Sequence, residues 1–398
     1  MNYRLPPSEV PIVPPRILLG PGPTTAHPRV LQAMSGQMIG YLDPDFIKIM
    51  DETSKLLKLL FQTENSNALS ISGTGSAGME AGINSLLEPG DTVIICVCGF
   101  FGQRMTDMAN RIGANVILLE SDWGKPFPSE MLKNELSKHK QVKLITIVHA
   151  ETSTGILQPL DEIALLAKEH DALLMVDAVT SLGGTKINVD DLGIDYCYSA
   201  SQKCLACPPG MAPAAISQQA LDAIKKRAQK PSSWYLDLEL IANYWGLDHV
   251  YHHTAPVSNI LGLREALKIV LEEGIETRIK RHHNNALALR TGLEALGLNP
   301  VVSREHMLDQ ITPVWIPEGI NDSEIRQSLL QKYNIEIGRG LGDFAGKVWR
   351  IGLMGESSRA ENVMLILSAL EKLLPVAGYE VAPGMGVAAA SKFLATDS

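Results

Sequence analysis

Two ionisable side chains lie at the ends of apolar segments near the middle of the chain. Leu173-Leu-Met-Val-Asp177 predicts a buried strand that ends in a carboxylate, and Tyr196-Cys-Tyr-Ser-Ala-Ser-Gln-Lys203 predicts a second strand that delivers an amine. Open α/β sheets bind their ligands at the carboxyl ends of parallel strands. Alone, Asp177 could be a helix cap and Lys203 a solvated loop residue. Together they predict a site.

This pair suits one cofactor. A lysine amine that is desolvated has a lowered pKa and becomes a nucleophile that condenses with an aldehyde. A carboxylate can keep a pyridine nitrogen protonated, so that the ring draws electrons from a bonded substrate. We therefore predict a pyridoxal phosphate site in which Lys203 forms a Schiff base and Asp177 binds the ring nitrogen.

A glycine-rich turn could bind the phosphate of such a cofactor. Ser72-Gly-Thr-Gly-Ser-Ala-Gly78 lies between a predicted strand and a predicted helix, and so offers backbone N–H groups, hydroxyls and a helix N-terminus. It also matches the G-x-G-x-x-G pattern of nicotinamide-dependent dehydrogenases. That alternative is weaker, because Ile94-Ile-Cys96, rather than a strand-end acid, lies about 20 residues further on.

An arginine in the last third of the chain is a candidate for substrate binding. Arg350 lies inside the apolar segment Val348-Trp-Arg-Ile-Gly352. There its guanidinium could bind a substrate carboxylate through two parallel hydrogen bonds, and the alternative is a structural salt bridge.

Cysteines and histidines predict no metal site. Cys204-Leu-Ala-Cys207 has the spacing of half a zinc site, but a second pair is missing. The neighbouring histidines of Tyr251-His-His-Thr254 would point to opposite faces of a strand. The pair His282 and His283 predicts an exposed helix surface.

The composition is that of a globular protein with neither nucleic acid nor a membrane as a partner. The chain has 398 residues, 45% of them hydrophobic, and a formal net charge of −9 that would repel a phosphate backbone. No apolar run approaches the roughly 18 residues that span a bilayer, and a signal-peptide pattern is missing. Five scattered cysteines fit a reducing compartment, so we expect a cytoplasmic protein.

A mainly parallel sheet covered by helices should position these groups, which places the chain in the α/β class. Apolar, β-branched segments alternate with helical ones between about 68 and 217. Their apolar continuity indicates burial on both faces. The predicted strands are Ala68–Ser72, Thr92–Cys96, Asn115–Leu119, Leu144–Val148, Leu173–Val176 and Tyr196–Ser199.

The remainder of the chain predicts a smaller α+β domain. Two long helical patterns, about 258–273 and 275–296, should bridge the two domains. The small domain is then predicted as strand 311–316, helix 322–333, strands 335–338 and 348–352, and helix 359–374. The last segment, 384–398, is weakly patterned, and we expect a flexible tail.

From Gly20 to about Leu374 the sequence resembles the class V aminotransferases of fold type I, most closely the alanine–glyoxylate and serine–pyruvate aminotransferases. Eight motifs in the right order carry the resemblance. They are Gly20-Pro-Gly-Pro-Thr24, Ser72-Gly-Thr-Gly-Ser76, Gly99-Phe-Phe-Gly-Gln-Arg104, Glu151-Thr-Ser-Thr-Gly155, Val176-Asp-Ala-Val-Thr-Ser-Leu-Gly-Gly184, Ser201-Gln-Lys203, Tyr251-His-His-Thr254 and Arg350-Ile-Gly352.

The resemblance implies a role for each matching residue. Lys203 would form the Schiff base and Asp177 would bind the pyridine nitrogen. Phe101 would stack on the ring, where relatives use a tryptophan with a larger face, and Thr152 would place a hydroxyl near the phenolic oxygen. The phosphate would be bound by Thr74, Gly75, Ser76 and Gln202, and by Tyr251 and Thr254 of the neighbouring subunit.

The resemblance also implies a substrate pocket and an assembly. Arg350 would bind the substrate carboxylate, and Gly22 in the loop 20–23 would line the same pocket together with Thr152. Active sites shared between subunits imply a homodimer. A seven-stranded sheet is expected in the large domain. We expect a segment 1–25 that lines the active site, a large cofactor-binding domain 26–279, a small domain 280–383 and a tail 384–398.

The implied reaction is transamination between a small amino acid and glyoxylate. L-alanine would give pyruvate, or L-serine would give hydroxypyruvate, and glyoxylate would become glycine. (S)-ureidoglycine is the alternative amino donor. A cysteine desulfurase-like lyase is a weaker alternative, since that chemistry needs a cysteine on a loop of the small domain and all five cysteines lie at or before Cys207. A non-catalytic scaffold is disfavoured, because a buried lysine and arginine without ligands would cost stability.

Overall fold

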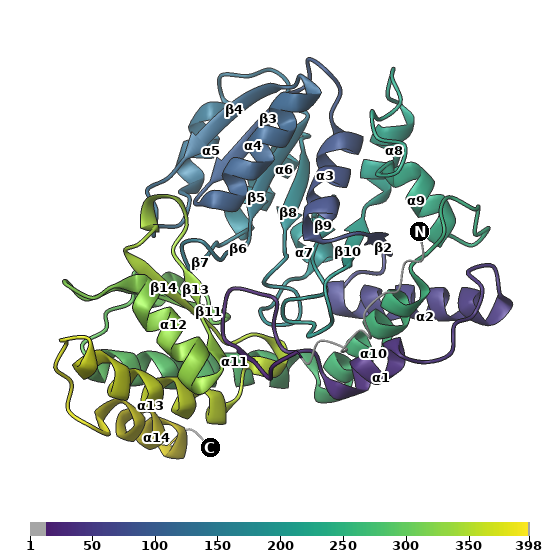
Figure 1. Cartoon of the computed structure of the whole chain (residues 1–398). Coiled ribbons are helices and arrows are strands. Elements are labelled where there is room, and N and C mark those ends of the chain that lie inside the picture. Colours follow the sequence, from purple (N-terminus) through teal and green to yellow (C-terminus); the bar gives the residue numbers. More distant parts are fainter. Residues whose placement is uncertain (1–12, 397–398) are drawn as a thin grey trace, which may run out of the picture.

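A seven-stranded sheet forms the centre of the computed structural model, which describes residues 13–396 (Figure 1). Its strand order is β2-β10-β9-β8-β5-β3-β4. The strands from β4 to β9 pair in parallel, and β10 is antiparallel to both of its neighbours. The bounds are β2 Asn67–Ser72, β3 Thr92–Val97, β4 Asn115–Glu120, β5 Leu144–Val148, β8 Leu173–Asp177, β9 Tyr196–Tyr198 and β10 Met211–Ile216.

This sheet confirms the predicted α/β class and each of the six predicted strands, with small shifts at their ends. The residues of β5 and β8 are all buried, as expected for strands covered on both faces. The apolar pattern alone did not predict β10. Its sequence Met-Ala-Pro-Ala-Ala-Ile is rich in small residues and contains a proline, so its strand signal is weak.

Helices precede, connect or follow the strands of this sheet. They are α1 Pro28–Met34, α2 Pro44–Phe61, α3 Gly75–Leu86, α4 Phe100–Ile112, α5 Ser129–Leu136, α6 Asp161–Glu169, α7 Val189–Leu192, α8 Gln218–Lys225 and α9 Leu238–Trp245. Helix α3 lies especially close to the sheet, because a Cβ on Gly82 would be only 2.4 Å from the ring of Tyr196. This contact helps to fix where the N-terminus of α3 lies.

The helices α10 Val257–Glu273 and α11 Ile275–Ala295 lead to a second hydrophobic core. There the strands pair in the order β11-β14-β13, and the sequence prediction of an α+β arrangement holds. The bounds are β11 Ile311–Trp315, α12 Asp322–Tyr333, β12 Ile335–Glu336, β13 Gly338–Arg339, β14 Val348–Gly352 and α13 Ala360–Val376. Three short 3₁₀ helices are η1 Arg304–His306, η2 Gly342–Phe344 and η3 Gly355–Ser357.

The N-terminal segment connects the two parts of the molecule. Strand β1, Ile17–Leu18, pairs in parallel with β12 in a separate two-stranded sheet. The chain then passes between the two sheets to reach α1 (Figure 1). A small hairpin of β6 Ala150–Glu151 and β7 Ile156–Leu157 extends the loop after β5. Of the predicted segment 1–25, residues 1–12 lie outside the described residues.

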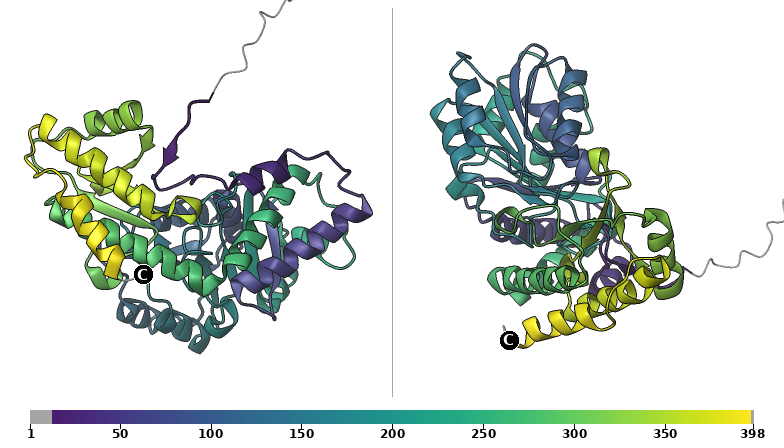
Figure 2. Two further views of the ribbon diagram at one scale, coloured as in Figure 1. Left: turned by 90° about the horizontal axis from the view of Figure 1, so that it is seen from below. Right: turned by 90° about the vertical axis from the view of Figure 1, so that its left-hand side faces the viewer.

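The C-terminal segment differs from our expectation. Instead of a flexible tail, residues Met385–Thr396 form helix α14, which packs on α11 and α13 (Figure 2). Ala390 is fully buried in the second core, and Glu371 of α13 accepts hydrogen bonds from the backbone N–H groups of Gly386 and Val387. The small residues of this segment give only a weak helical pattern in the sequence. In the structure they allow α14 to pack closely against α11 and α13. Residues 397–398 lie outside the described part.

His282 also differs from our expectation, because its side chain is fully buried rather than exposed. Its Nδ1 donates to the carbonyl of Arg278, and its Nε2 accepts from the N–H of Gly355. Burial, followed by the charges of Arg278 and Arg281, lowers the pKa of His282 to about 3. Only His283 of the pair is exposed.

His282 should make stability depend on pH. Its folded pKa of about 3 lies below the ordinary 6.5, so between these values the unfolded chain binds a proton that the folded chain does not. The free energy of unfolding should therefore fall as the pH drops, by about 2 kcal/mol for this group between pH 6.5 and 5. We expect His282→Gln to reduce this slope in denaturant titrations. An unchanged slope would contradict the assignment.

Candidate active site

One cavity at the carboxyl end of the large sheet brings together residues that are far apart in the sequence. Its lining residues include the end of β8 and the first residues of α3 and α4. Figure 1 labels these three elements. Eight of the predicted site residues line it, namely Thr74, Gly75, Ser76, Phe101, Thr152, Asp177, Gln202 and Lys203. The same wall includes Met79, Arg104, Val148, Ala150, Val179 and Thr180.

Lys203 lies on the loop after β9, and its side chain is almost completely buried. Its amine donates a hydrogen bond to the carbonyl of Pro21, and within residues 13–396 it forms no salt bridge. Burial, together with the charge of Arg350, lowers the pKa of Lys203 to about 8. A substantial share of the amine is therefore neutral near physiological pH, as a nucleophile or a general base requires.

Asp177 is the last residue of β8 and is also buried. One carboxylate oxygen accepts from the N–H of Val179 at 2.8 Å, and the other accepts from the hydroxyl of Tyr198 at 2.5 Å. Burial raises the pKa of Asp177, although these hydrogen bonds and the charge of Lys203 oppose the rise. A buried carboxylate without an ionic partner among the described residues is well suited to bind a protonated ring nitrogen.

The glycine-rich turn forms a cradle at the start of α3. Thr74 is the N-cap residue, but its side chain makes no capping hydrogen bond and remains available for a ligand. Gln202 has a buried side-chain oxygen that finds no hydrogen-bond partner within the described part of the chain. The backbone N–H groups of the first helical turn and these side chains together can bind a phosphate.

Phe101 and Thr152 are held in place by one buried carboxylate. Glu151 accepts from the N–H of Phe101 at 3.0 Å, and from the N–H and the hydroxyl of Ser153 at 3.0 and 2.6 Å. These bonds tie the start of α4 to the β6–β7 hairpin, which carries Thr152. Glu151 therefore fixes the ring of Phe101 and the hydroxyl of Thr152 on the cavity wall.

The predicted substrate residues lie beside this cavity. Gly22 is so close to Lys203 that a Cβ at this position would be 2.7 Å from the lysine Nζ, and its φ of +109° also favours glycine. Arg350 is buried in β14, and its guanidinium donates to the carbonyls of Arg339 and Thr152. Burial lowers its pKa to about 10. Within residues 13–396 no carboxylate forms a salt bridge with Arg350, so the structural salt bridge that was the alternative for this arginine is not found among these residues.

Tyr251 and Thr254 are not part of this cavity. Both side chains are exposed, and residues 251–254 form an irregular loop rather than the strand that we expected. The expectation that the two histidines point apart is therefore wrong, since the Nδ1 atoms of His252 and His253 are 2.9 Å apart. Nε2 of His253 is 2.7 Å from the hydroxyl of Ser72, next to the cradle.

Three residues of the site were not assigned by sequence reasoning. Glu151 supports the neighbouring Thr152, and Tyr198 supports Asp177. The signal for Tyr198 lies in the pairing of β8 with β9, which places it opposite Asp177. Arg104 donates to the hydroxyl of Ser76, and its guanidinium lies 4.8 Å from the centre of the Phe101 ring. Arg104 is the last residue of the motif Gly99-Phe-Phe-Gly-Gln-Arg104, but the motif alone did not indicate its role.

Residues 13–396 contain no group of acidic, cysteine or histidine side chains arranged to bind a metal ion. All five cysteines are free and buried. Among these residues, no helix combines the length and apolar character needed to cross a membrane.

Comparisons with known proteins agree on one family. The family description "Aminotransferase class-V" matches residues 17–347. The (S)-ureidoglycine–glyoxylate transaminase of Bacillus subtilis is 41% identical over 379 residues, which cover 91% of each chain. Alanine–glyoxylate aminotransferase of Callithrix jacchus is 41% identical over 91% of this chain and 88% of its own. A crystal structure of alanine–glyoxylate aminotransferase from Nostoc sp. matches with a TM-score of 0.90 and 47% identity, over 93% of this chain and 97% of that one.

Replacing the buried Glu151 should destabilise the site even without a ligand. In Glu151→Gln, the amide can accept only at one end, so one of the donors Phe101 N–H or Ser153 N–H loses its acceptor. We expect the free energy of unfolding to fall by about 2 kcal/mol. Thermal unfolding of the ligand-free protein measures this. The control Glu120→Gln changes an exposed carboxylate that binds Gln103, and equal melting temperatures for the two variants would contradict the assignment.

Proposed function

The chain belongs to the class V aminotransferases, and we propose that it transfers the amino group of a small amino acid, L-alanine or alternatively L-serine, to glyoxylate. The products are pyruvate, or hydroxypyruvate from serine, and glycine. Enzymes of this family use pyridoxal phosphate. Glyoxylate is the acceptor named for both groups of relatives, which supports it as the acceptor here.

The observation that carries this proposal is a buried amine and a buried carboxylate that share one cavity without ionic partners. Lys203 and Asp177 each cost free energy when they are buried alone. Pyridoxal phosphate complements both, through its aldehyde and its ring nitrogen, and its phosphate fits the cradle formed by Thr74, Gly75, Ser76 and Gln202. The residues present therefore fit the cofactor. When bound, it supplies an aldehyde that captures amino groups and a ring that accepts electrons from the substrate's α carbon.

The side chains of this protein then bind the substrate and move its protons. Arg350 binds the substrate carboxylate with the guanidinium N–H groups that the backbone carbonyls leave free. Nζ of Lys203 takes the proton from the substrate's α carbon, which its lowered pKa permits near neutral pH. Asp177 would keep a proton on the ring nitrogen, and Phe101 would pack against the ring. The hydroxyl of Thr152 lies on the cavity wall.

The alternative amino donor is (S)-ureidoglycine. It is favoured by the crystal structure of ureidoglycine–glyoxylate aminotransferase from Bacillus subtilis, which matches 96% of this chain with a TM-score of 0.94. That enzyme is 41% identical to this chain, so identity alone does not separate the two donors. Donor profiling decides between them.

We also propose the predicted domain division, with a large cofactor-binding domain 26–279 and a small domain 280–383. The two hydrophobic cores support this division, since the buried residues of the second core are Leu19 and residues from Ala288 onward. The C-terminal helix α14 joins the small domain.

A cytoplasmic location is supported by the five free, buried cysteines and can be checked by cell fractionation.

We propose that the protein forms a homodimer, in which Tyr251 and Thr254 bind the cofactor phosphate of the neighbouring subunit. Support comes from the exposure of both side chains outside their own cavity, with 56% of Tyr251 accessible. A large tyrosine exposed in this way is usual at an interface between subunits.

The absorption spectrum tests the proposed reaction. The protein loaded with pyridoxal phosphate should show a visible band that bleaches with L-alanine and returns with glyoxylate. Lys203→Ala should lose transaminase activity by at least about 100-fold, because the amine that moves the proton is missing. Lys186→Ala, an exposed lysine, is the control and should behave as the parent protein. A parent protein without such a band would refute the proposal, and bleaching with ureidoglycine alone would establish the other donor.

Complementation between subunits tests the shared site. Lys203→Ala and Thr254→Ala damage the same active site from different chains if the site is shared. A mixed dimer then contains one site with both defects and one intact site, so mixing two weakly active variants should restore about a quarter of the parental activity on random exchange of subunits. Light scattering measures the assembly in parallel. The absence of any restored activity in a verified mixed dimer would contradict the assignment.

A further inference from the structure

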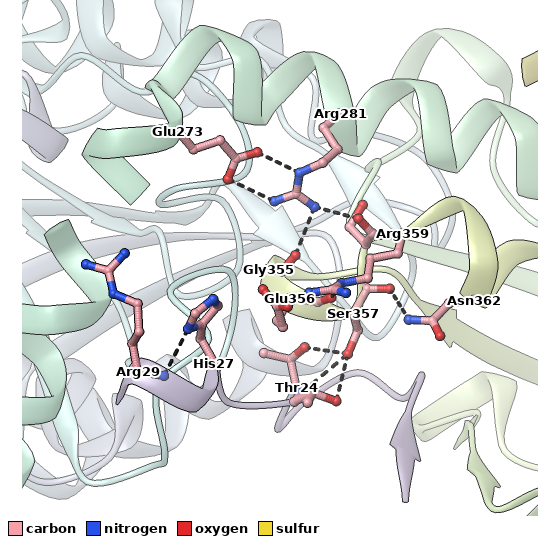
Figure 3. Close-up of polar contacts among 12 residues, drawn as sticks. Thr24, His27, Arg29, Glu273, Arg281, Gly355, Glu356, Ser357, Arg359 and Asn362 are labelled. Carbon is pink, nitrogen blue, oxygen red and sulfur yellow. Dashed lines mark hydrogen bonds and ion pairs between the residues drawn. The ribbon is translucent and has the colours of Figure 1, made fainter. Parts of the chain in front are cut away.

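The corner between α10 and α11 carries a carboxylate that binds two arginines. Helix α10 ends at Glu273, Gly274 turns the chain with a φ of +84°, and α11 begins at Ile275. Glu273 accepts from Arg278 at 2.5 Å and from Arg281 at 2.6 and 3.1 Å. Figure 3 shows Glu273 facing the guanidinium of Arg281. The two arginines are three residues apart on α11, so they lie on one face of that helix.

The first of these arginines binds the loop that carries Lys203. Arg278 is 3% exposed, and besides Glu273 it donates to the carbonyls of Gly183 at 3.0 Å and Cys204 at 2.5 Å. Cys204 directly follows Lys203 in the chain. The guanidinium therefore fixes the backbone from which the lysine side chain extends.

The second arginine binds the segment that follows the strand of Arg350. Arg281 donates to the carbonyls of Gly355 at 3.0 Å and Ser358 at 2.5 Å, in and just beyond η3 (Figure 3). The neighbouring His282 accepts from the N–H of Gly355. Only two residues separate η3 from β14, the strand that contains Arg350.

The two bound segments also touch each other. A Cβ on Gly355 would lie 2.9 Å from the carbonyl oxygen of Cys204 and 3.2 Å from that of Lys203. Two cations on one face of α11 thus hold four backbone carbonyls, those of Gly183, Cys204, Gly355 and Ser358. The guanidinium groups of Arg278 and Arg281 repel each other, and that of Arg278 is also buried. The negative charge of Glu273 offsets this repulsion and the cost of desolvation, which neutral backbone carbonyls alone could not do.

We propose that Glu273 is a positioning residue which, through two arginines of α11, holds Lys203 and Arg350 at the separation that an amino acid substrate must span. The substrate's α carbon must meet the lysine amine while its carboxylate meets the arginine. Lys203 follows β9, which packs in the first hydrophobic core, whereas Arg350 lies in β14, which packs in the second. Glu273 links their supporting segments at the point where both reach α11. This proposal rests on the roles given to Lys203 and Arg350 in the proposed function.

The test compares Glu273→Gln with Glu272→Gln. Both changes remove one carboxylate from the last turn of α10, but Glu272 binds Arg29 at the surface, away from the cavity. In Glu273→Gln the KM for the amino donor and the Kd of propionate, an unreactive carboxylate measured by calorimetry, should rise by about tenfold. In Glu272→Gln both should stay within about twofold of the parent values.

A double-mutant cycle with Arg350→Ala separates positioning from general destabilisation. If Glu273 acts by placing Arg350, its replacement should raise the KM no further when the arginine side chain is already missing. Equal effects in both backgrounds would overturn the proposal. Parental KM and Kd in a folded Glu273→Gln protein would overturn it as well and leave the role of Arg350 intact.

Two further outcomes are informative. Parental KM and Kd in Arg350→Ala would refute the carboxylate-binding role in the proposed function, and this proposal with it. If Glu273→Gln does not fold, Arg281→Lys takes its place, because a lysine keeps the charge but cannot bind Glu273 and two carbonyls in the same geometry. The same rise in KM and Kd is expected for that variant, and parental values would overturn the proposal.

Discussion

The structure depends on the burial of two ionisable groups of opposite charge that do not pair with each other. Lys203 and Asp177 lie in one cavity, and their pKa values move toward the neutral forms because both are desolvated. Ion pairing would have been the simplest way to stabilise them. Instead, each is held by neutral donors or acceptors, the carbonyl of Pro21 and the hydroxyl of Tyr198. A cofactor with complementary groups relieves this unfavourable arrangement.

Rigid surroundings make that arrangement possible. Asp177 lies at the end of β8, a strand whose residues are all buried. The close contact of Gly82 with Tyr196 fixes the position of α3, so that its first turn faces the same cavity. Buried polar side chains then fix the loops, with Glu151 behind Thr152 and Glu273 at the α10–α11 corner. Because each of these groups is anchored by several hydrogen bonds, little of the site depends on a single flexible loop.

Much of this could be predicted from the sequence, since Asp177 ends a strand with a clear apolar pattern and Lys203 lies on the loop after the next strand, β9. Helices α10 and α12 were placed within one residue for the same reason. The elements and residues that were missed or wrongly predicted have weak or misleading signals in the local sequence. Strand β10 and helix α14 consist largely of small residues, whose stability comes from packing rather than pattern. His282 seemed exposed because its burial is caused by η3, a segment about seventy residues later in the chain.

The course of the N-terminal segment has a consequence for how the chain folds as it is synthesised. Strand β1 pairs with β12, and Thr24 donates to the carbonyl of Met354, which lies 330 residues further along the chain, so these contacts can form only long after the N-terminal segment has been made. The large sheet can form while the ribosome is still at work, but the segment that carries Pro21, the hydrogen-bond partner of Lys203, is tied down only when β12 and Met354 have emerged. Completion of the pocket thus follows the folding of the large sheet.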